Sequence, residues 1–148
     1  MKRILSILLV IVLVVAAALF LRTIYERDQA TRTGNAMVMD ITTEALRSWD
    51  AALIIENADP ALLSATQPDV FHTLFLALSR LGMLQELTDI RYEMILPSFW
   101  QISTTASADY TMQAAFEHGN AEIRISVTRK NGQWYFTSYQ VLTPLLNA

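Results

Sequence analysis

Few side chains in this sequence have the types and spacing that enzyme chemistry needs. The 148 residues include two histidines and no cysteine, so a thiol nucleophile is excluded. There is no His-x-His or His-x₃-His pair and no carboxylate cluster, which are common ligand sets for metal ions. No serine lies in a Gly-x-Ser-x-Gly context, and the 4 glycines form no phosphate-binding loop. We therefore expect no metal, no cofactor and no catalytic residue.

General acid–base catalysis would need an ionisable side chain within reach of a substrate. Strand pairing directs most acidic residues of the predicted sheet outward. The polar or ionisable side chains left for a pocket between helices and sheet are His72, Tyr92, Tyr110 and Trp134. Each is also an amphipathic residue of the kind that packs into a core, and packing is the interpretation that we favour.

The stretch TRKNGQWYFTSYQV, residues 128–141, predicts the hairpin that positions several of these side chains. Asn131-Gly132 is a strong hairpin signal, because both central residues of a type I′ turn need a positive φ. This turn pairs Val127 with Phe136. The aromatic residues of the last strand then lie opposite aliphatic residues of the strand before it.

A second turn is predicted at Gly119-Asn120, where it pairs Phe116 with Ile123. The two predicted registers agree on one apolar face, which we expect to pack under the helices. Its members are Tyr110, Met112, Ala114, Phe116, Ile123, Ile125, Val127, Trp134 and Phe136.

The opposite face of the predicted sheet is polar but nearly uncharged. Arg124, Tyr135, Thr137 and Tyr139 lie on it, and the register places Arg124 opposite Tyr139. One interpretation is a solvated face that is rich in threonine and tyrosine. The other is a contact surface for a protein partner or a homodimer, because tyrosine and arginine are enriched in interfaces and lysine and glutamate are depleted.

Helical spacing of apolar residues precedes the strands, from residue 36 to about residue 82. Asp59 is an N-cap candidate before Pro60, and Gly82 lies where a C-cap belongs. Phe99 and Trp100, between the first two strands, are expected to close the end of the core. The sequence thus predicts an α+β fold, with an N-terminal transmembrane helix followed by helices packed on a curved antiparallel sheet of about four strands.

Residues 4–21 contain no charge, and about 18 residues of helix match the thickness of a membrane core. We interpret residues 1–22 as a transmembrane signal anchor, 23–35 as a stalk whose helix ends at Gly34-Asn35, and 36–148 as the folded domain. A cleaved signal peptide is the alternative, with a weak Ala-x-Ala site at residues 16–18, although the apolar run continues beyond it.

Lys2 and Arg3 precede the apolar run, which favours a cytoplasmic N-terminus in a bacterial inner membrane and a periplasmic or extracellular domain. The chain has a net charge of −3, and no basic cluster follows the apolar run, so nucleic acid is not an expected partner. The expected partners are the membrane and either another protein or a second copy.

Helices followed by a sheet that ends in GNAEIRISVTRKNGQWYFTSYQV resemble the nuclear-transport-factor-like, cystatin-like cone superfamily. The residues that carry the resemblance are Gly119, Ile123, Ile125, Val127, Gly132, Trp134 and Phe136. The chain is most similar to small membrane-anchored bacterial domains of that superfamily, over roughly residues 36–148. The resemblance implies a pocket between helices and sheet and frequent dimers through the sheet. Catalytic members place Asp, His or Tyr inside the cone, and no such motif matches here.

Two functions follow from these observations. The first is a membrane-tethered, non-catalytic interaction or assembly module that faces the periplasm. The second is a cone domain that binds a small ligand or acts as an isomerase or dehydratase. An interior filled by Phe71, Trp134 and Phe136 favours the first, and ionisable groups around a roomy cavity favour the second.

Overall fold

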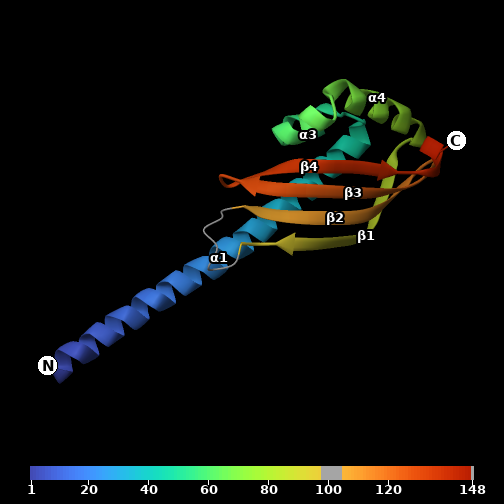
Figure 1. Cartoon of the computed structure of the whole chain (residues 1–148). Helices are drawn as coiled ribbons and strands as arrows, with labels where there is room; N and C mark the ends of the chain where they lie inside the picture. Colours follow the sequence, from blue (N-terminus) through green and yellow to red (C-terminus); the bar gives the residue numbers. More distant parts are fainter. Residues whose placement is uncertain (98–104, 148) are drawn as a thin grey trace. The chain divides into compact units, whose positions relative to one another are not determined.

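The computed structural model describes residues 1–97 and 105–147, and Phe99 and Trp100 lie outside the described residues. It has the α+β architecture that the sequence predicts: a long N-terminal helix, short helices and a four-stranded antiparallel open sheet (Figure 1). The helices are α1 (Lys2–Ser48), α2 (Ala52–Glu56), α3 (Pro60–Ala65), α4 (Pro68–Leu78), η1 (Ser79–Leu81) and η2 (Pro144–Asn147). The strands are β1 (Leu84–Ile95), β2 (Ala106–Phe116), β3 (Gly119–Lys130) and β4 (Gln133–Leu142), and they lie side by side in that order.

The chain divides into two compact units, residues 1–32 and residues 33–148. The first unit consists of the N-terminal part of α1, whose apolar side chains are exposed from Ile4 to Tyr25. Within the described residues, α1 is the one helix that is long and apolar enough to cross a membrane, with a mean hydropathy of 3.4 in its most apolar window. These properties fit a membrane anchor or a signal sequence.

The prediction that Gly34-Asn35 ends this helix is wrong, because α1 continues through both residues to Ser48. Gly34 is buried against Trp134, and a Cβ atom at Gly34 would lie 2.9 Å from Cε2 of that ring. The side chain of Asn35 accepts a hydrogen bond of 2.5 Å from the hydroxyl of Tyr110. Both residues therefore serve the contact between α1 and the sheet, where small size and a polar acceptor are needed within the helix.

The last hairpin has the predicted register around its turn. Asn131 and Gly132 have φ values of 50° and 81°, as a type I′ turn requires. Lys130 pairs with Gln133, and Val127 pairs with Phe136. This agreement confirms that the Asn-Gly turn fixes which side chains share a face from the turn as far as Val127 and Phe136.

The turn between β2 and β3 differs from its prediction, because Phe116 pairs with Gly119 and not with Ile123. The turn therefore lies at Glu117 and His118. The backbone N–H of Glu117 donates to Met83, and that of His118 donates to the carbonyl of residue 81, at 3.1 and 2.9 Å. These long-range bonds hold the turn. The partner of Phe116 moves by an even number of residues, so every side chain stays on its predicted face.

A β-bulge in the last hairpin overturns the predicted position of Tyr139. Ser126 pairs with Ser138 but Val127 pairs with Phe136, which leaves Thr137 as an extra residue on β4. One extra residue exchanges the two faces for the rest of the strand. Tyr139 consequently lies opposite Ile125, is only 6% exposed, and belongs to the core. The partner of Arg124 is Gln140, and not Tyr139 as predicted.

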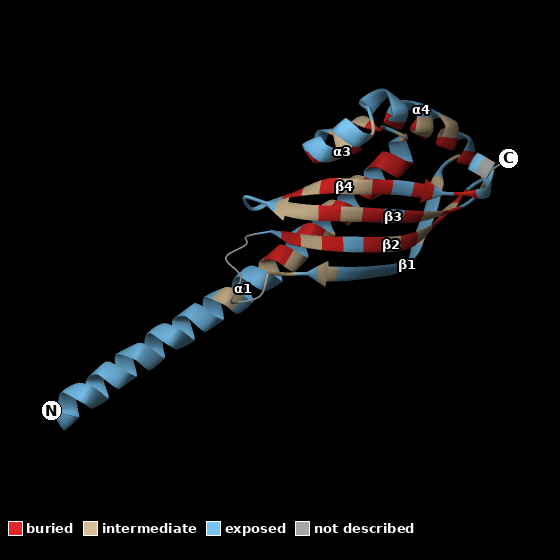
Figure 2. Ribbon diagram, in the orientation of Figure 1, coloured by how far each residue is buried: buried red, intermediate tan, exposed pale blue. Residues whose placement is uncertain are grey.

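The core lies between the helices and one face of the sheet. Along β2, β3 and β4, buried residues alternate with half-buried or exposed residues, whereas β1 is mostly exposed (Figure 2). All nine residues of the predicted apolar face are buried, which confirms that face. At the far end of the core, the ring of Trp49 stacks on Phe116 at 5.1 Å and donates a hydrogen bond to the carbonyl of Gly82.

The link between α2 and α3 is bound to the edge of β4 through Asp59. Its backbone N–H donates to the carbonyl of Phe136 at 2.8 Å, and its carboxylate caps α3 by accepting from Ala61, as Asp59-Pro60 predicts. The same carboxylate accepts a 2.5 Å bond from Nζ of Lys130. The Lys130 bond first, and the Ala61 bond second, hold the pKa of Asp59 below its usual value.

Substitution Gly34→Ala is expected to lower the melting temperature. In an exposed helix this change gains about 1 kcal/mol, but overpacking a close contact costs about 1–3 kcal/mol. Circular dichroism melting of the full chain in lipid nanodiscs measures the sign. In a Trp134→Leu background the same substitution should be harmless or stabilising, because the clashing ring is gone. A higher melting temperature for Gly34→Ala alone would contradict the close contact.

Substitution Asp59→Asn is expected to lower the free energy of unfolding at neutral pH. The difference in this free energy between the variant and the unaltered chain should become smaller in acid. The folded pKa of Asp59 lies below the unfolded value of about 3.9, so its contribution is complete above that value and is lost as pH falls through the lowered folded pKa. Urea unfolding of the full chain between pH 7 and pH 2 measures this difference. Asp40→Asn, the same change at an exposed position of α1, is the control and should show no such convergence. A difference that is constant with pH would contradict the role of the carboxylate.

Candidate functional site

The four residues proposed for an interior pocket do not converge on one space. Tyr110 and Trp134 are buried, at 2% and 7% exposure, whereas His72 on α4 and Tyr92 on β1 are exposed. Indole Nε1 of Trp134 donates to the hydroxyl of Thr33 at 3.3 Å. The two buried members thus bind α1 to the sheet. His72 is exposed to solvent, and Tyr92 lies at the exposed edge of the inner sheet face, next to Tyr110.

Tyr110 is the interior residue whose ionisable group could in principle act as a catalytic base. Its environment, however, keeps the phenol protonated and neutral. Burial, and secondly the neighbouring Tyr92, raise the pKa of Tyr110 to about 12. The ring of Tyr92 stacks on Tyr110 with centroids 5.8 Å apart, and the hydroxyl of Tyr110 is engaged by Asn35. A neutral hydroxyl in such a pair is a structural hydrogen-bond donor, and it is a poor base near neutral pH.

Aromatic rings fill the space between α4 and the sheet. Phe75 lies 6.1 Å from Tyr139, and Tyr139 lies 5.7 Å from Phe136, as measured between ring centroids. Phe71 and Phe136 are also buried, at 3% and 0% exposure. The interior at this position therefore consists of packed side chains.

Two hydroxyl groups are buried within this packed interior. Burial raises the pKa of Tyr139 well above its usual value, and the neighbouring hydroxyl of Thr42 opposes that rise only in part. Within the described residues, neither hydroxyl has a hydrogen-bond partner of good geometry. The pair lies in the contact between α1 and β4, where it makes the core locally polar.

The outer face of the sheet carries a network of polar side chains. Glu122 accepts from Nε of Arg124 at 2.5 Å and from the amide of Gln113 at 3.1 Å. The hydroxyl of Ser126 donates to Asp109 at 2.6 Å. The charges of this surface are thus largely satisfied by its own neighbours, which lowers the cost of covering them.

Three of the four predicted interface residues lie on or beside this outer face. The side chain of Arg124 is exposed, and Tyr135 and Thr137 are half-buried. The hydroxyl of Tyr135 donates to Gln133 at 2.8 Å. Tyr139 is removed from the group by the bulge. We define the outer sheet face as Gln113, Glu122, Arg124, Ser126, Tyr135 and Thr137.

A groove beside β1 was not predicted from the sequence. It has a volume of about 220 Å³ and lies between α1 and the edge strand. Its walls are formed by Met39, Thr43, Arg47, Leu84, Gln85, Glu86, Leu87 and Ile90. The repeat of Met39, Thr43 and Arg47 at every fourth residue was the available signal, because it places three side chains on one stripe of α1.

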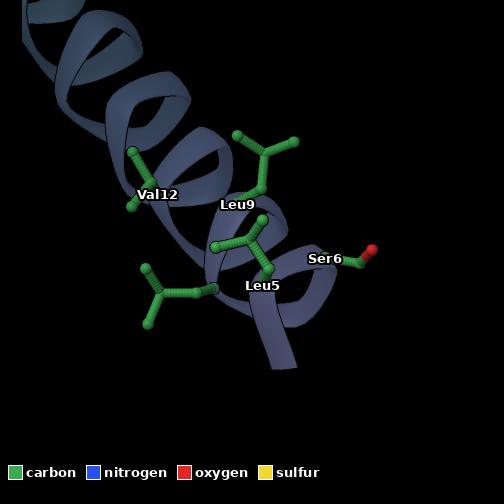
Figure 3. Close-up of a pocket in the computed structure, with 5 residues that line it drawn as sticks. Leu5, Ser6, Leu9 and Val12 are labelled. Atoms are coloured by element: carbon green, nitrogen blue, oxygen red, sulfur yellow. The ribbon is translucent and has the colours of Figure 1, made fainter. Parts of the chain in front are cut away.

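Two other features bear less on a binding site. The hollow in Figure 3 lies on the surface of the apolar N-terminal helix and is lined by residues of successive helical turns. These are Leu5, Ser6, Leu8, Leu9 and Val12. Such a surface is suited to contact with lipid chains. Among the residues that the structure describes, no group of three or more His, Asp or Glu side chains lies close enough to hold a metal ion.

Comparison of the chain with known protein families, with curated proteins and with solved structures found no match.

Proposed function

We propose that this chain is a membrane-tethered interaction domain without catalytic activity, built on a helix-plus-sheet fold of the nuclear-transport-factor-like kind. The observation that carries the proposal is the contrast between the two faces of one sheet. The inner face is packed with aromatic rings, and the outer face presents a hydrogen-bonded, weakly charged surface around Arg124. A surface of this composition resembles the protein interfaces in which Tyr and Arg are enriched.

The packing of the interior weighs against the alternative of a ligand-binding or enzymatic cone. A roomy cavity with converging ionisable groups would support that alternative. Here, Phe71, Trp134 and Phe136 are buried core residues, and burial favours the neutral form of Tyr110. The proposal therefore places the function on the outside of the domain.

The proposal takes the apolar N-terminal helix as an anchor that is not cleaved. Its apolar side chains continue through Leu19, Phe20 and Leu21, beyond the weak cleavage site at residues 16–18. Lys2 and Arg3 precede the apolar run, which favours a cytoplasmic N-terminus and a domain on the other side of the membrane.

Reporter fusions after Ala148 are expected to be active only when the reporter folds outside the cytoplasm. The physical reason is the retention of Lys2 and Arg3 on the cytoplasmic side. Mass spectrometry of the purified chain should find the N-terminal residues still attached. Activity of a cytoplasmic reporter would contradict the orientation, and a mature N-terminus at Leu19 would contradict the anchor.

Substitution Thr137→Glu is expected to abolish capture of a partner, or self-association, without unfolding the domain. A single charge at a partly exposed site changes stability by about 0.5 kcal/mol or less, whereas burying it unpaired in an interface is strongly unfavourable. Site-specific crosslinking from Tyr135 in the membrane, together with sedimentation of the solubilised chain, measures both effects.

Substitution Thr73→Glu is the matched control, because it makes the same change at an exposed position of α4. It should leave crosslinking and sedimentation as in the unaltered chain. If Thr137→Glu and the unaltered chain give identical crosslinked species, the outer sheet face is a solvated surface and not an interface, which would contradict the proposal.

A further inference from the structure

The two edge strands of the sheet, β1 and β4, differ in whether another segment of the chain hydrogen-bonds to their outer backbone. At the edge of β4, the backbone of Phe136 exchanges hydrogen bonds with the link before α3, donating to Asn57 and accepting from Asp59 at 2.8 Å each. β1 forms the other edge and, within the described residues, pairs with β2 alone. Every second residue of an edge strand directs its N–H and C=O away from the sheet. The edge of β1 is therefore a template for one more strand.

The part of this edge that is regular enough to pair is short. The register of β1 against β2 shifts between Thr88 and Arg91, where Asp89 has a φ of 51°. The guanidinium of Arg91 donates to the carboxylate of Asp89 at 3.1 and 3.2 Å, which fixes this bulge. From Arg91 to Ile95 the pairing continues without a shift. Five residues is close to the length of an average strand, about 5–6 residues.

The two sides of the edge have different chemistry. On the helix-facing side, Ile90 and Tyr92 are apolar or amphipathic and are 43% and 52% exposed. The groove beside α1 opens next to Ile90 and offers space for one more apolar side chain. On the other side, Glu93 is exposed, makes no ion pair within the described residues, and lies beside a second carboxylate, that of Asp109. The flanking residues on that side are Arg91, which is paired with Asp89, and Ile95, which is 61% exposed.

We propose that the edge of β1 at Arg91–Ile95 binds an extended segment of another protein as a fifth strand. Side chains alternate between the two faces of a strand. The segment that fits therefore alternates apolar residues, which cover Tyr92 and reach toward the groove at Ile90, with basic residues, which face Glu93 and Asp109. The binding group is the strand edge of β1, which is not among the residues of the outer sheet face, so the inference goes beyond the function proposed above.

A second copy of this chain fits the edge less well. Within the folded unit, α1 runs along β2, because Asn35 bonds Tyr110 and Trp49 stacks on Phe116. Antiparallel pairing of two β1 strands requires a two-fold axis perpendicular to the sheet, which reverses the direction of α1 in the second copy. The two chains would then begin their folded units at opposite ends of the joint sheet. Symmetric pairing about the middle residue of Arg91–Ile95 also places Glu93 opposite its own copy, and like charges directly opposite each other are destabilising.

Hydrogen exchange of the full chain in lipid nanodiscs tests the inference. The probe is a synthetic ten-residue peptide that alternates valine or isoleucine with lysine or threonine. At a peptide concentration about ten times its dissociation constant, amide exchange in the Arg91–Ile95 segment is expected to slow by about tenfold. The same peptide with proline at two valine positions should give no protection, because proline removes strand hydrogen bonds.

Charge reversal tests the basic side of the proposed segment. Substitution Glu93→Lys should weaken binding of the basic peptide by up to about fivefold, as expected for an exposed ion pair, and should favour a peptide with glutamate at the lysine positions. Glu56→Lys, the same change at an exposed position of α2, should leave the affinity unchanged. Thr137→Glu should also leave it unchanged, which separates this inference from the proposed role of the outer sheet face.

Several results would overturn the inference. These are an absence of protection at Arg91–Ile95, equal protection by the proline peptide, and protection confined to β4 or to the outer sheet face. Disulfide-linked dimers of a Tyr92→Cys chain in the absence of peptide would assign the edge to a second copy and would equally overturn it.

Discussion

The contact between α1 and the inner face of the sheet is the constraint on which the other features depend. Gly34 lets the helix approach the ring of Trp134, and Asn35 supplies the acceptor that a buried Tyr110 hydroxyl needs. A larger residue at position 34 would separate helix and sheet at this point. Because this contact decides which face is covered, it also decides that the polar side chains around Arg124 remain on the uncovered face.

The extra residue at Thr137 also affects which side chains of β4 lie on the inner face of the sheet and which lie on the outer face. Without it, strict alternation would place Tyr139 outside and a polar residue against Phe75. The bulge instead supplies a third ring to the aromatic cluster of Phe75 and Phe136. The cost is a buried phenol hydroxyl beside Thr42 without a well-formed hydrogen bond. The ring therefore improves the packing while its hydroxyl weakens the core locally.

Features that depend on local chemistry were predictable from the sequence, and features that depend on distant contacts were not. The Asn131-Gly132 turn and the Asp59-Pro60 helix start each follow from the conformational preferences of two adjacent residues. The turn at Glu117 and His118 was missed because it is held by carbonyls near Gly82, more than thirty residues earlier in the chain. Similarly, a glycine within a helix indicates a helix end unless the ring that packs against it is known.

The candidate binding surfaces were also predicted only where local sequence determines them. Composition identified the outer sheet face, but the position of Tyr139 depended on a bulge that alternation alone does not indicate. His72 and Tyr92 were placed toward the interior because an apolar neighbourhood in sequence usually means a buried one. Tyr92 lies on a strand that has a neighbour on one side only, so half of its ring remains exposed. The exposure of β1 follows from strand order, and strand order is a property of the whole sheet.

The distribution of polar groups supports the proposal that this domain binds at its surface and performs no chemistry in its interior. A general base must reach a substrate and must lose its proton near neutral pH. Burial keeps Tyr110 and Tyr139 protonated, and aromatic neighbours occupy the space that a substrate would need. The exposed surfaces carry the complementary properties: unpaired strand backbone at β1, and amphipathic side chains held in place by their own hydrogen bonds on the outer face. Both features favour association with another chain, because each presents groups that are already ordered and lose little conformational freedom on binding.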